Sequence, residues 1–251
     1  MTSFITAIAK EVGANLVALQ LYPLGLWSRD PIGNAHTSSA LNPRPVLLVH
    51  GIIHNRSAFI HMKNQMEKMG WQNIFTMNYS TWHGNLALME EQLRERVEYI
   101  LEKTKSKQLD IVAHSLGGVV ARHFMTLGTG RGKVGHLVTL GTPHQGTDTG
   151  FLLKAVTGMS LYSDLRTRSA YIQALNEGTL PKGSLITSIR SPYDLWVWPN
   201  VRGVAMGVPR KSFHNILINT VGHTGLLYSS EVFQAVTSAL VPDDDISPKV
   251  V

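Results

Sequence analysis

Ser115, Asp194 and His223 are the residue types, in the chain order, that nucleophilic catalysis by a serine requires. A serine hydroxyl is inert at neutral pH unless a base takes its proton, and an acid must orient that base. One group of enzymes with a nucleophilic serine carries these residues in the same chain order, with the nucleophile first, the acid second and the histidine last. The sequence therefore predicts acyl-transfer chemistry with Ser115 as the nucleophile, His223 as the base and Asp194 as the acid.

The context of Ser115 supports this prediction. The segment Ala-His-Ser-Leu-Gly-Gly at 113–118 follows the apolar run 109–112 and precedes a helical run. A nucleophilic serine on a strained turn between strand and helix needs small residues two positions before and after it, and Ala113 and Gly117 meet that need. The alternative is that Ser115 only caps the following helix.

The base and the acid are chosen by position. Among eleven histidines, His223 follows a predicted strand, precedes the last predicted helix and lies between Gly222 and Gly225, which let its loop bend. Asp194 follows the predicted strand that ends near residue 189, whereas its rivals Asp148 and Asp164 lie in a presumed insertion. The alternatives are that His223 is an exposed loop histidine and that Asp194 only caps a turn.

An acyl-transfer site also needs donors for the oxyanion and a pocket for the substrate. The predicted donors are the backbone N–H groups of Ile52, in the loop Val-His-Gly-Ile-Ile at 49–53, and of Leu116. Predicted pocket residues are His50, Ile53, His114, Phe151, Leu152 and Trp196. No pair of histidines combines the i, i+4 spacing of a zinc site with a third ligand, so we expect neither a metal nor another cofactor.

The elements that must position these residues alternate between strands and helices. Strands are predicted at 46–49, 74–79, 109–113, 135–140, 184–190 and 213–220, and helices at 56–69, 85–105, 116–127, 163–176 and 229–240. Such alternation predicts an α/β fold with a mostly parallel central sheet covered by helices on both faces. We expect a catalytic domain at 44–241, a lid-like insertion around 147–182 and a flexible tail at 242–251.

Residues 1–43 are expected to form an amphipathic helix over 3–21, ending before Pro23, followed by a turn-rich connector. The apolar positions Phe4, Ile8, Val12, Leu16 and Leu19 predict a helix that covers the core. The alternative is a helix lying at a membrane interface. No secretory signal is visible, and we expect no run to reach the roughly 18 to 20 apolar residues that span a bilayer, which leaves a cytoplasmic and a mature secreted protein both open.

The formal charge of +6 bears on which partners the protein binds, and the absence of cysteine excludes disulfides and thiolate chemistry. Basic residues are scattered, and those between 94 and 107 alternate with glutamates at helical spacing, which is typical of a solvated helix face. We therefore expect no nucleic-acid partner. The expected partner is a small-molecule or lipid ester, with transient contact to a lipid surface, and the oligomeric state stays open.

Taken together, the motifs resemble the α/β-hydrolase superfamily and, more closely, its small bacterial lipases and esterases. The resemblance rests on Val-His-Gly-Ile at 49–52, Ala-His-Ser-Leu-Gly-Gly at 113–118, Leu-Gly-Thr-Pro-His-Gln-Gly at 140–146, Ser-Pro-Tyr-Asp at 191–194 and Gly-His at 222–223. The alanine at 113 is similar to that of small Bacillus-type lipases. The resemblance implies metal-independent hydrolysis of esters, from short acyl esters to triacylglycerols.

Two other functions stay open at this point. An acyltransferase or lipid deacylase would use the same three residues and differ in the acceptor, and a binding protein would have kept the fold without catalysis. If the insertion forms an apolar wall over Ser115, a charge at Phe151 or Leu152 should impair hydrolysis of long acyl esters more than of acetyl esters.

Overall fold

The computed structural model describes residues 2–27, 42–81, 84–149 and 161–241, and its centre is a six-stranded sheet in which every pairing is parallel. The strands follow one another in space in the order β2-β1-β3-β4-β5-β6. Their bounds are β1 Val46–Val49, β2 Ile74–Thr76, β3 Leu109–His114, β4 Val134–Leu140, β5 Leu185–Arg190 and β6 Phe213–Leu217. The predicted α/β class and parallel sheet are confirmed.

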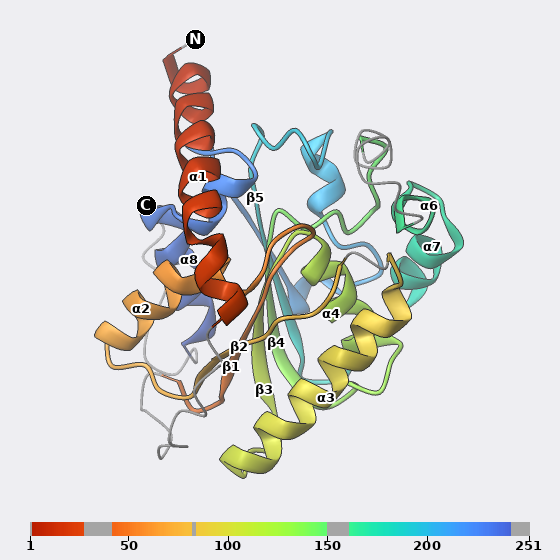
Figure 1. Cartoon of the computed structure of the whole chain (residues 1–251). Helices are drawn as coiled ribbons and strands as arrows, with labels where there is room; N and C mark the ends of the chain where they lie inside the picture. Colours follow the sequence, from red (N-terminus) through yellow and green to blue (C-terminus); the bar gives the residue numbers. More distant parts are fainter. Residues whose placement is uncertain (1, 28–41, 82–83, 150–160, 242–251) are drawn as a thin grey trace.

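Helices cover both faces of this sheet (Figure 1). The α-helices are α1 Thr2–Trp27, α2 Ile60–Lys68, α3 Leu86–Thr104, α4 Leu116–Thr126, α6 Leu161–Leu165, α7 Ala170–Glu177 and α8 Ser230–Leu240. Short 3-10 helices are η1 Arg56–Phe59, η2 Asn200–Gly203, η3 Arg210–Ser212 and η4 Thr224–Leu227. Parallel strands need crossovers of this kind, because a tight turn cannot join them.

Two hydrophobic cores lie on the two faces of the sheet. Alternate residues of a strand point to opposite faces, so Leu47 and Val49 of β1 pack with α3 and α4, whereas Val46 and Leu48 pack with α2 and α8. All four side chains are buried. Burial on both faces explains why the strands appear in the sequence as continuous apolar runs instead of alternating ones.

Some predicted bounds differ from the structure. The strand predicted at 74–79 ends at Thr76, and the single helix predicted at 163–176 is divided into α6 and α7. The second of these starts at a cap, since the side chain of Ser169 accepts a hydrogen bond from the backbone N–H of Ile172. A serine that bonds its own downstream backbone favours a helix start over a helix interior.

The N-terminal helix α1 does not end before Pro23, as predicted, but continues to Trp27. A proline inside a helix removes a backbone hydrogen bond and leaves carbonyl groups to be satisfied otherwise. Two asparagines from the body of the protein supply donors to carbonyls in the last turns of the helix: Asn55 Nδ2 donates to the Tyr22 carbonyl at 2.9 Å, and Asn78 Nδ2 donates to the Gly25 carbonyl at 2.8 Å. The helix is therefore extended by contacts that its own sequence does not reveal.

The face of α1 that packs on the body is also not the predicted one. Small residues are buried there, namely Ala7, Ala14, Ala18 and Gly25. The large apolar side chains predicted to cover the core are between 46% and 71% exposed: Phe4, Ile8, Val12, Leu16 and Leu19. Small side chains let the helix backbone approach η1 and η4 closely, and Figure 1 shows the N-terminal end of α1 projecting beyond the body.

Among the helices that the structure describes, α1 alone is long and apolar enough over Phe4–Leu26 to cross a membrane, judged by length and composition only. The expectation that no run reaches this length is wrong. Only 17% of the most apolar window is buried. The core helix of a globular protein would be mostly buried, so α1 is a docked surface helix with a wide apolar face left uncovered.

Candidate active site

Ser115 occupies a sharp turn between β3 and α4, with φ 53° and ψ −124°. A positive φ is unfavourable for a residue with a side chain, so the surroundings must hold this backbone in place. The N–H of Ser115 donates to the Leu140 carbonyl at 2.9 Å, and Thr142 Oγ1 donates to the Ser115 carbonyl at 3.0 Å. The Ser115 side chain makes no capping bond to α4.

Gly117 shows why the turn demands small residues. A methyl group built on Gly117 would lie 2.5 Å from the carbonyl oxygen of His50 and 2.9 Å from that of Val49. Neither backbone atom can move without disturbing β1. Any larger residue at position 117 would therefore push the turn away from the sheet.

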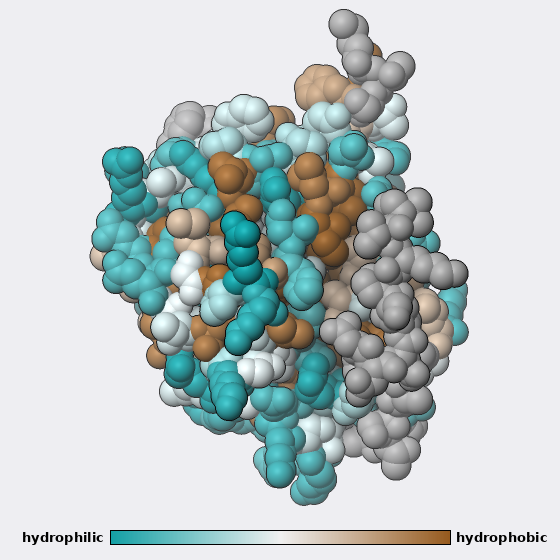
Figure 2. Space-filling model, turned by 180° about the vertical axis from the view of Figure 1, so that it is seen from behind, coloured by the Kyte–Doolittle hydropathy of each residue, from teal (hydrophilic) through white to brown (hydrophobic). Residues whose placement is uncertain are grey.

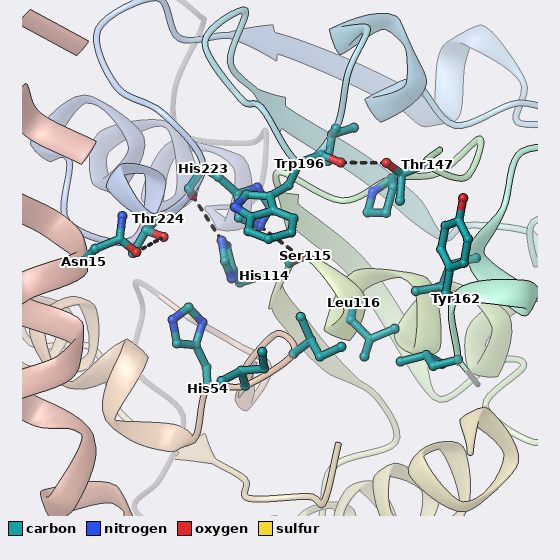
Figure 3. A pocket seen from close by; sticks show the side chains of 16 residues that line it. Asn15, His54, His114, Ser115, Leu116, Thr147, Tyr162, Trp196, His223 and Thr224 are labelled. Atoms are coloured by element: carbon teal, nitrogen blue, oxygen red, sulfur yellow. Dashed lines mark hydrogen bonds between the residues drawn. The ribbon is translucent and has the colours of Figure 1, made fainter. Parts of the chain in front are cut away.

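The structure brings Ser115, His223 and Asp194 into one chain of hydrogen bonds, and Figure 3 shows Ser115 and His223 of this chain. The Nε2 atom of His223 lies 3.0 Å from Ser115 Oγ, and its Nδ1 atom lies 2.7 Å from Asp194 Oδ2. When the carboxylate accepts the Nδ1 proton, Nε2 is left free to accept the serine proton. This arrangement can generate a serine nucleophile.

Asp194 is held by its own loop and is 1% exposed. Its Oδ1 atom accepts hydrogen bonds from the backbone N–H groups of Trp196 and Val197, both at 2.9 Å. Those two bonds fix the carboxylate and leave Oδ2 for His223. The rival Asp148 is paired instead with Arg202 at 2.8 Å.

His223 is surrounded by groups that control its charge. Burial lowers its pKa, but the charge and hydrogen bond of Asp194, and then the charge of Glu11, outweigh burial and raise the pKa above its ordinary value. Neighbouring histidines behave in the opposite way: burial and the charge of His223 lower the pKa of His114 far below its ordinary value and that of His54 to about 4. The site therefore concentrates its protonation on one imidazole.

A cavity of about 230 Å³ opens above Ser115. Of the residues predicted around the site, Ile52, Ile53, His114, Leu116 and Trp196 line it. Other lining residues that the sequence analysis did not single out for this role include Asn15, Pro143, Thr147, Leu161, Tyr162 and Leu165. The cavity wall is mostly apolar, which suits the acyl chain of an ester.

His50 does not line this cavity, contrary to the prediction. Its ring is fully buried and stacks on Tyr79 with ring centroids 4.4 Å apart, while Tyr79 Oη donates to the His50 carbonyl. Its Nδ1 atom lies 2.8 Å from the carbonyl oxygen of Gly51, so His50 supports the loop that carries Ile52. Phe151 and Leu152 lie outside the described residues.

Two polar residues of α1, Glu11 and Asn15, lie next to the site and were not predicted there. Glu11 accepts hydrogen bonds from the backbone N–H groups of Thr224 and Gly225, and Asn15 Oδ1 accepts one from the Thr224 hydroxyl. Glu11 is the only acidic residue of α1, and an isolated acid in an apolar helix is a signal that could have been noticed. Within the described ranges, no group of three or more His, Cys, Asp or Glu side chains is placed to hold a metal ion.

The chain is similar to known lipases in sequence and in structure. Residues 43–207 match the family model described as "Lipase (class 2)". The chain is similar in structure to a lipase of Bacillus licheniformis (15% identity, 82% of this chain, 94% of that chain, TM-score 0.65) and to lipase B of Aspergillus fumigatus (17%, 80%, 54%, 0.65). It is also similar to a monoacylglycerol lipase of Paleococcus ferrophilus (12%, 78%, 95%, 0.57). At these identities the structural likeness concerns the α/β-hydrolase fold alone.

Proposed function

This chain belongs to the class 2 lipase family, and from that premise we propose that it hydrolyses carboxylic esters through an acyl-enzyme on Ser115. The observation that carries the proposal is the continuous hydrogen-bonded chain from Asp194 through His223 to Ser115, at 2.7 and 3.0 Å, on the floor of an apolar cavity. A serine that only stabilised the fold would need neither the histidine nor the cavity.

The chemistry follows from these positions. Ser115 Oγ attacks the ester carbonyl while His223 Nε2 takes its proton, and Asp194 stabilises the imidazolium that forms. The tetrahedral oxyanion accepts hydrogen bonds from the backbone N–H groups of Ile52 and Leu116, the latter at the positive end of the α4 dipole. His223 then protonates the departing alkoxide. In the second half, His223 takes a proton from water as the water oxygen attacks the acyl carbon. His223 then returns this proton to Ser115 Oγ as the bond from Ser115 to the acyl carbon breaks and the carboxylic acid leaves.

Replacement of Ser115 tests the mechanism. We expect Ser115→Ala to keep the fold and to lose about 10⁴-fold or more in kcat, because the three residues act as a unit. Hydrolysis of p-nitrophenyl esters from acetyl to palmitoyl, with melting temperature as the fold control, measures both. Turnover near that of the unaltered protein would remove the mechanism. Product analysis in the presence of an added alcohol distinguishes hydrolysis from acyl transfer.

The substrate class we propose is a lipid ester presented at a lipid surface. The apolar side chains of α1 are exposed, and the ring of Phe4 contacts that of Tyr193 with centroids 5.8 Å apart. Tyr193 precedes exposed Leu195, Trp196 and Trp198, and Trp196 lines the cavity. On the face seen in Figure 2, the largest hydrophobic patches lie in the upper half, towards the end to which α1 projects in Figure 1.

Vesicle binding tests this surface. The formal charge of +6 favours an anionic surface, so we use phosphatidylglycerol vesicles, with phosphatidylcholine vesicles as the uncharged comparison. We expect the double variant Val12→Asp, Leu19→Asp to bind about 100-fold more weakly, because each of the two apolar side chains contributes about 1.5 kcal/mol when buried. Hydrolysis of a soluble acetyl ester should be unchanged. Gln20→Glu, which adds a charge without removing an apolar side chain, is the control, and equal binding by all three proteins would contradict the proposal.

A further inference from the structure

We propose that α1 is a working part of the active site, in which Glu11 positions the catalytic base His223. The proposal rests on the function given above and adds to it a residue from outside the segment, 43–207, that matches the family model. Glu11 does not touch the reacting atoms. It acts on the backbone directly after His223, and Asn15 assists it.

The contact between Glu11 and the loop after His223 uses both carboxylate oxygens. Oε1 accepts the N–H of Thr224 and Oε2 accepts the N–H of Gly225, each at 2.8 Å. Asn15 Oδ1 accepts the Thr224 hydroxyl at 3.1 Å, and Asn15 Nδ2 donates to Glu11 Oε1 at 3.4 Å. Hydrogen bonds to a charged acceptor are stronger than neutral ones. Because two such bonds hold neighbouring N–H groups, they fix the orientation of the loop backbone as well as its position.

The loop is shaped to receive this carboxylate. A methyl group built on Gly222 would lie 2.7 Å from Glu11 Oε2, and one on Gly225 would lie 3.2 Å from the same atom. The glycines that flank His223 therefore make room for Glu11, besides allowing the loop to bend. If α1 only covered apolar surface, the loop that faces it would not need glycines at positions 222 and 225.

His223 is fixed from three directions as a result. Glu11 holds the two N–H groups that follow it, His114 Nε2 donates to its carbonyl oxygen at 3.2 Å, and Asp194 holds its ring. A displacement of about 1 Å between base and nucleophile can cost about 100-fold in rate. Removing the restraint from Glu11, which does not line the cavity, should therefore slow the chemistry while leaving the cavity wall in place.

The charge of Glu11 also reaches the imidazole. Asp194 is the charged group in contact with the ring of His223, and Glu11 is the second negative charge that raises the pKa of His223. The neighbouring His54 and His114 have lowered pKa values. The reactive form is the neutral imidazole. Loss of the Glu11 charge lowers the pKa of His223, so the acid limb of the rate profile must move to lower pH.

Three variants separate positioning from stability. We expect Glu11→Gln, which keeps one acceptor oxygen but no charge, to reduce kcat on a soluble short-chain ester by about 10-fold with KM little changed, and Glu11→Ala to reduce it by about 10- to 100-fold. Glu11→Asp should recover part of the rate. In Glu11→Gln the acid limb of kcat/KM should lie at lower pH. Gln20→Ala, at an exposed position of the same helix, should match the unaltered protein in all respects.

The outcome against the proposal is equally definite. If Glu11→Gln loses melting temperature while kcat and the acid limb stay where they are, Glu11 only anchors the helix and the proposal is overturned. Two NMR measurements need no substrate: protection of the Thr224 and Gly225 amides from hydrogen exchange, and titration of the His223 imidazole. A protein inactive on every ester that still showed both effects would refute the ester-hydrolase function and leave the positioning role of Glu11 standing.

Discussion

At the scale of single residues, Gly141 sets how closely the acid and base can pack. Its φ is +56°, and a methyl group built on it would lie 2.9 Å from Asp194 Oδ2 and 3.0 Å from His223 Nδ1. The glycine therefore both adopts a backbone conformation that other residues avoid and leaves space beneath the hydrogen bond between the two side chains.

We expect Gly141→Ala to reduce kcat by about 10- to 100-fold, because the added methyl displaces the acid from the base. The positive φ adds a stability cost of about 1 to 2 kcal/mol. Steady-state kinetics and urea unfolding measure the two effects separately. Gly132→Ala is the matched control, since Gly132 also has a positive φ of 80° but has no atom within 4 Å of the added methyl. If the two variants have equal kcat values, the close packing at Gly141 is irrelevant to catalysis.

Sequence order was sufficient to select Ser115, Asp194 and His223, which the structure brings together, because a late loop and a strand end are recognisable from their neighbours. It was insufficient for Gly141 and Glu11. The need for a glycine at 141 depends on two side chains that lie more than fifty and eighty residues further along. Such contacts leave no local pattern in the chain.

At the scale of elements, Arg122 joins α4 to the segments packed around it. Its side chain is fully buried, and its guanidinium donates to the carbonyls of His144 at 3.4 Å and Leu175 at 3.1 Å, to the carbonyl of Met206, and to Asn176 Oδ1 at 3.1 Å. Burial lowers its pKa to about 10, so it stays charged at neutral pH. One side chain thus satisfies acceptors from α7 and two loops.

Replacing Arg122 by Met, which has no donors, should reduce the free energy of unfolding by about 3 kcal/mol, because several buried acceptors lose their partner. Urea unfolding measures the change. Arg94→Met on α3, where the arginine lies at the surface and pairs with Glu91 and Glu98, should cost less than about 1 kcal/mol. A cost for Arg122→Met no larger than that of Arg94→Met would contradict this role.

The elements themselves were largely predictable, with α1 as the exception. Buried parallel strands and their crossover helices carry strong apolar patterns, as in β3 and α3. The pattern of α1 identified a helix but assigned its apolar face to the core. The apolar face is exposed because the small residues of α1 make its contact with the body of the protein. Periodicity alone does not distinguish an apolar face that packs against protein from one that does not.

At the scale of the whole molecule, buried neutral histidines should set the acid limit of stability. His50, His114, His136 and His144 are each at most 3% exposed, and burial lowers the pKa of His50 and His136 to about 4 and those of the other two well below the ordinary value. The unfolded chain binds protons at these sites from about pH 6.5 downward, whereas the folded protein does not.

Stability should therefore fall as the pH drops from about 6.5 to about 4, by as much as about 1.4 kcal/mol per pH unit for each such histidine. Two groups oppose this loss, since the pKa of Asp110 is raised by burial to about 6 and that of His223 is also raised. The four histidines, together with His54, whose pKa is also lowered to about 4, outnumber these two groups. Urea unfolding between pH 7 and pH 4.5 measures the slope, and His136→Asn should make it shallower. A slope of zero would mean that the buried imidazoles do not govern acid unfolding.

The contact between Glu11 and Thr224 spans 213 residues of sequence, which has a consequence for how the protein is made. A ribosome adding about 5 to 20 residues per second needs roughly 10 to 40 s to synthesise that interval. During this time α1 has left the ribosome with its apolar side chains exposed and without the loop that receives it. Chaperones or a nearby bilayer can hold the nascent helix in that period, and the base becomes fixed in place only after Thr224 and Gly225 have been translated.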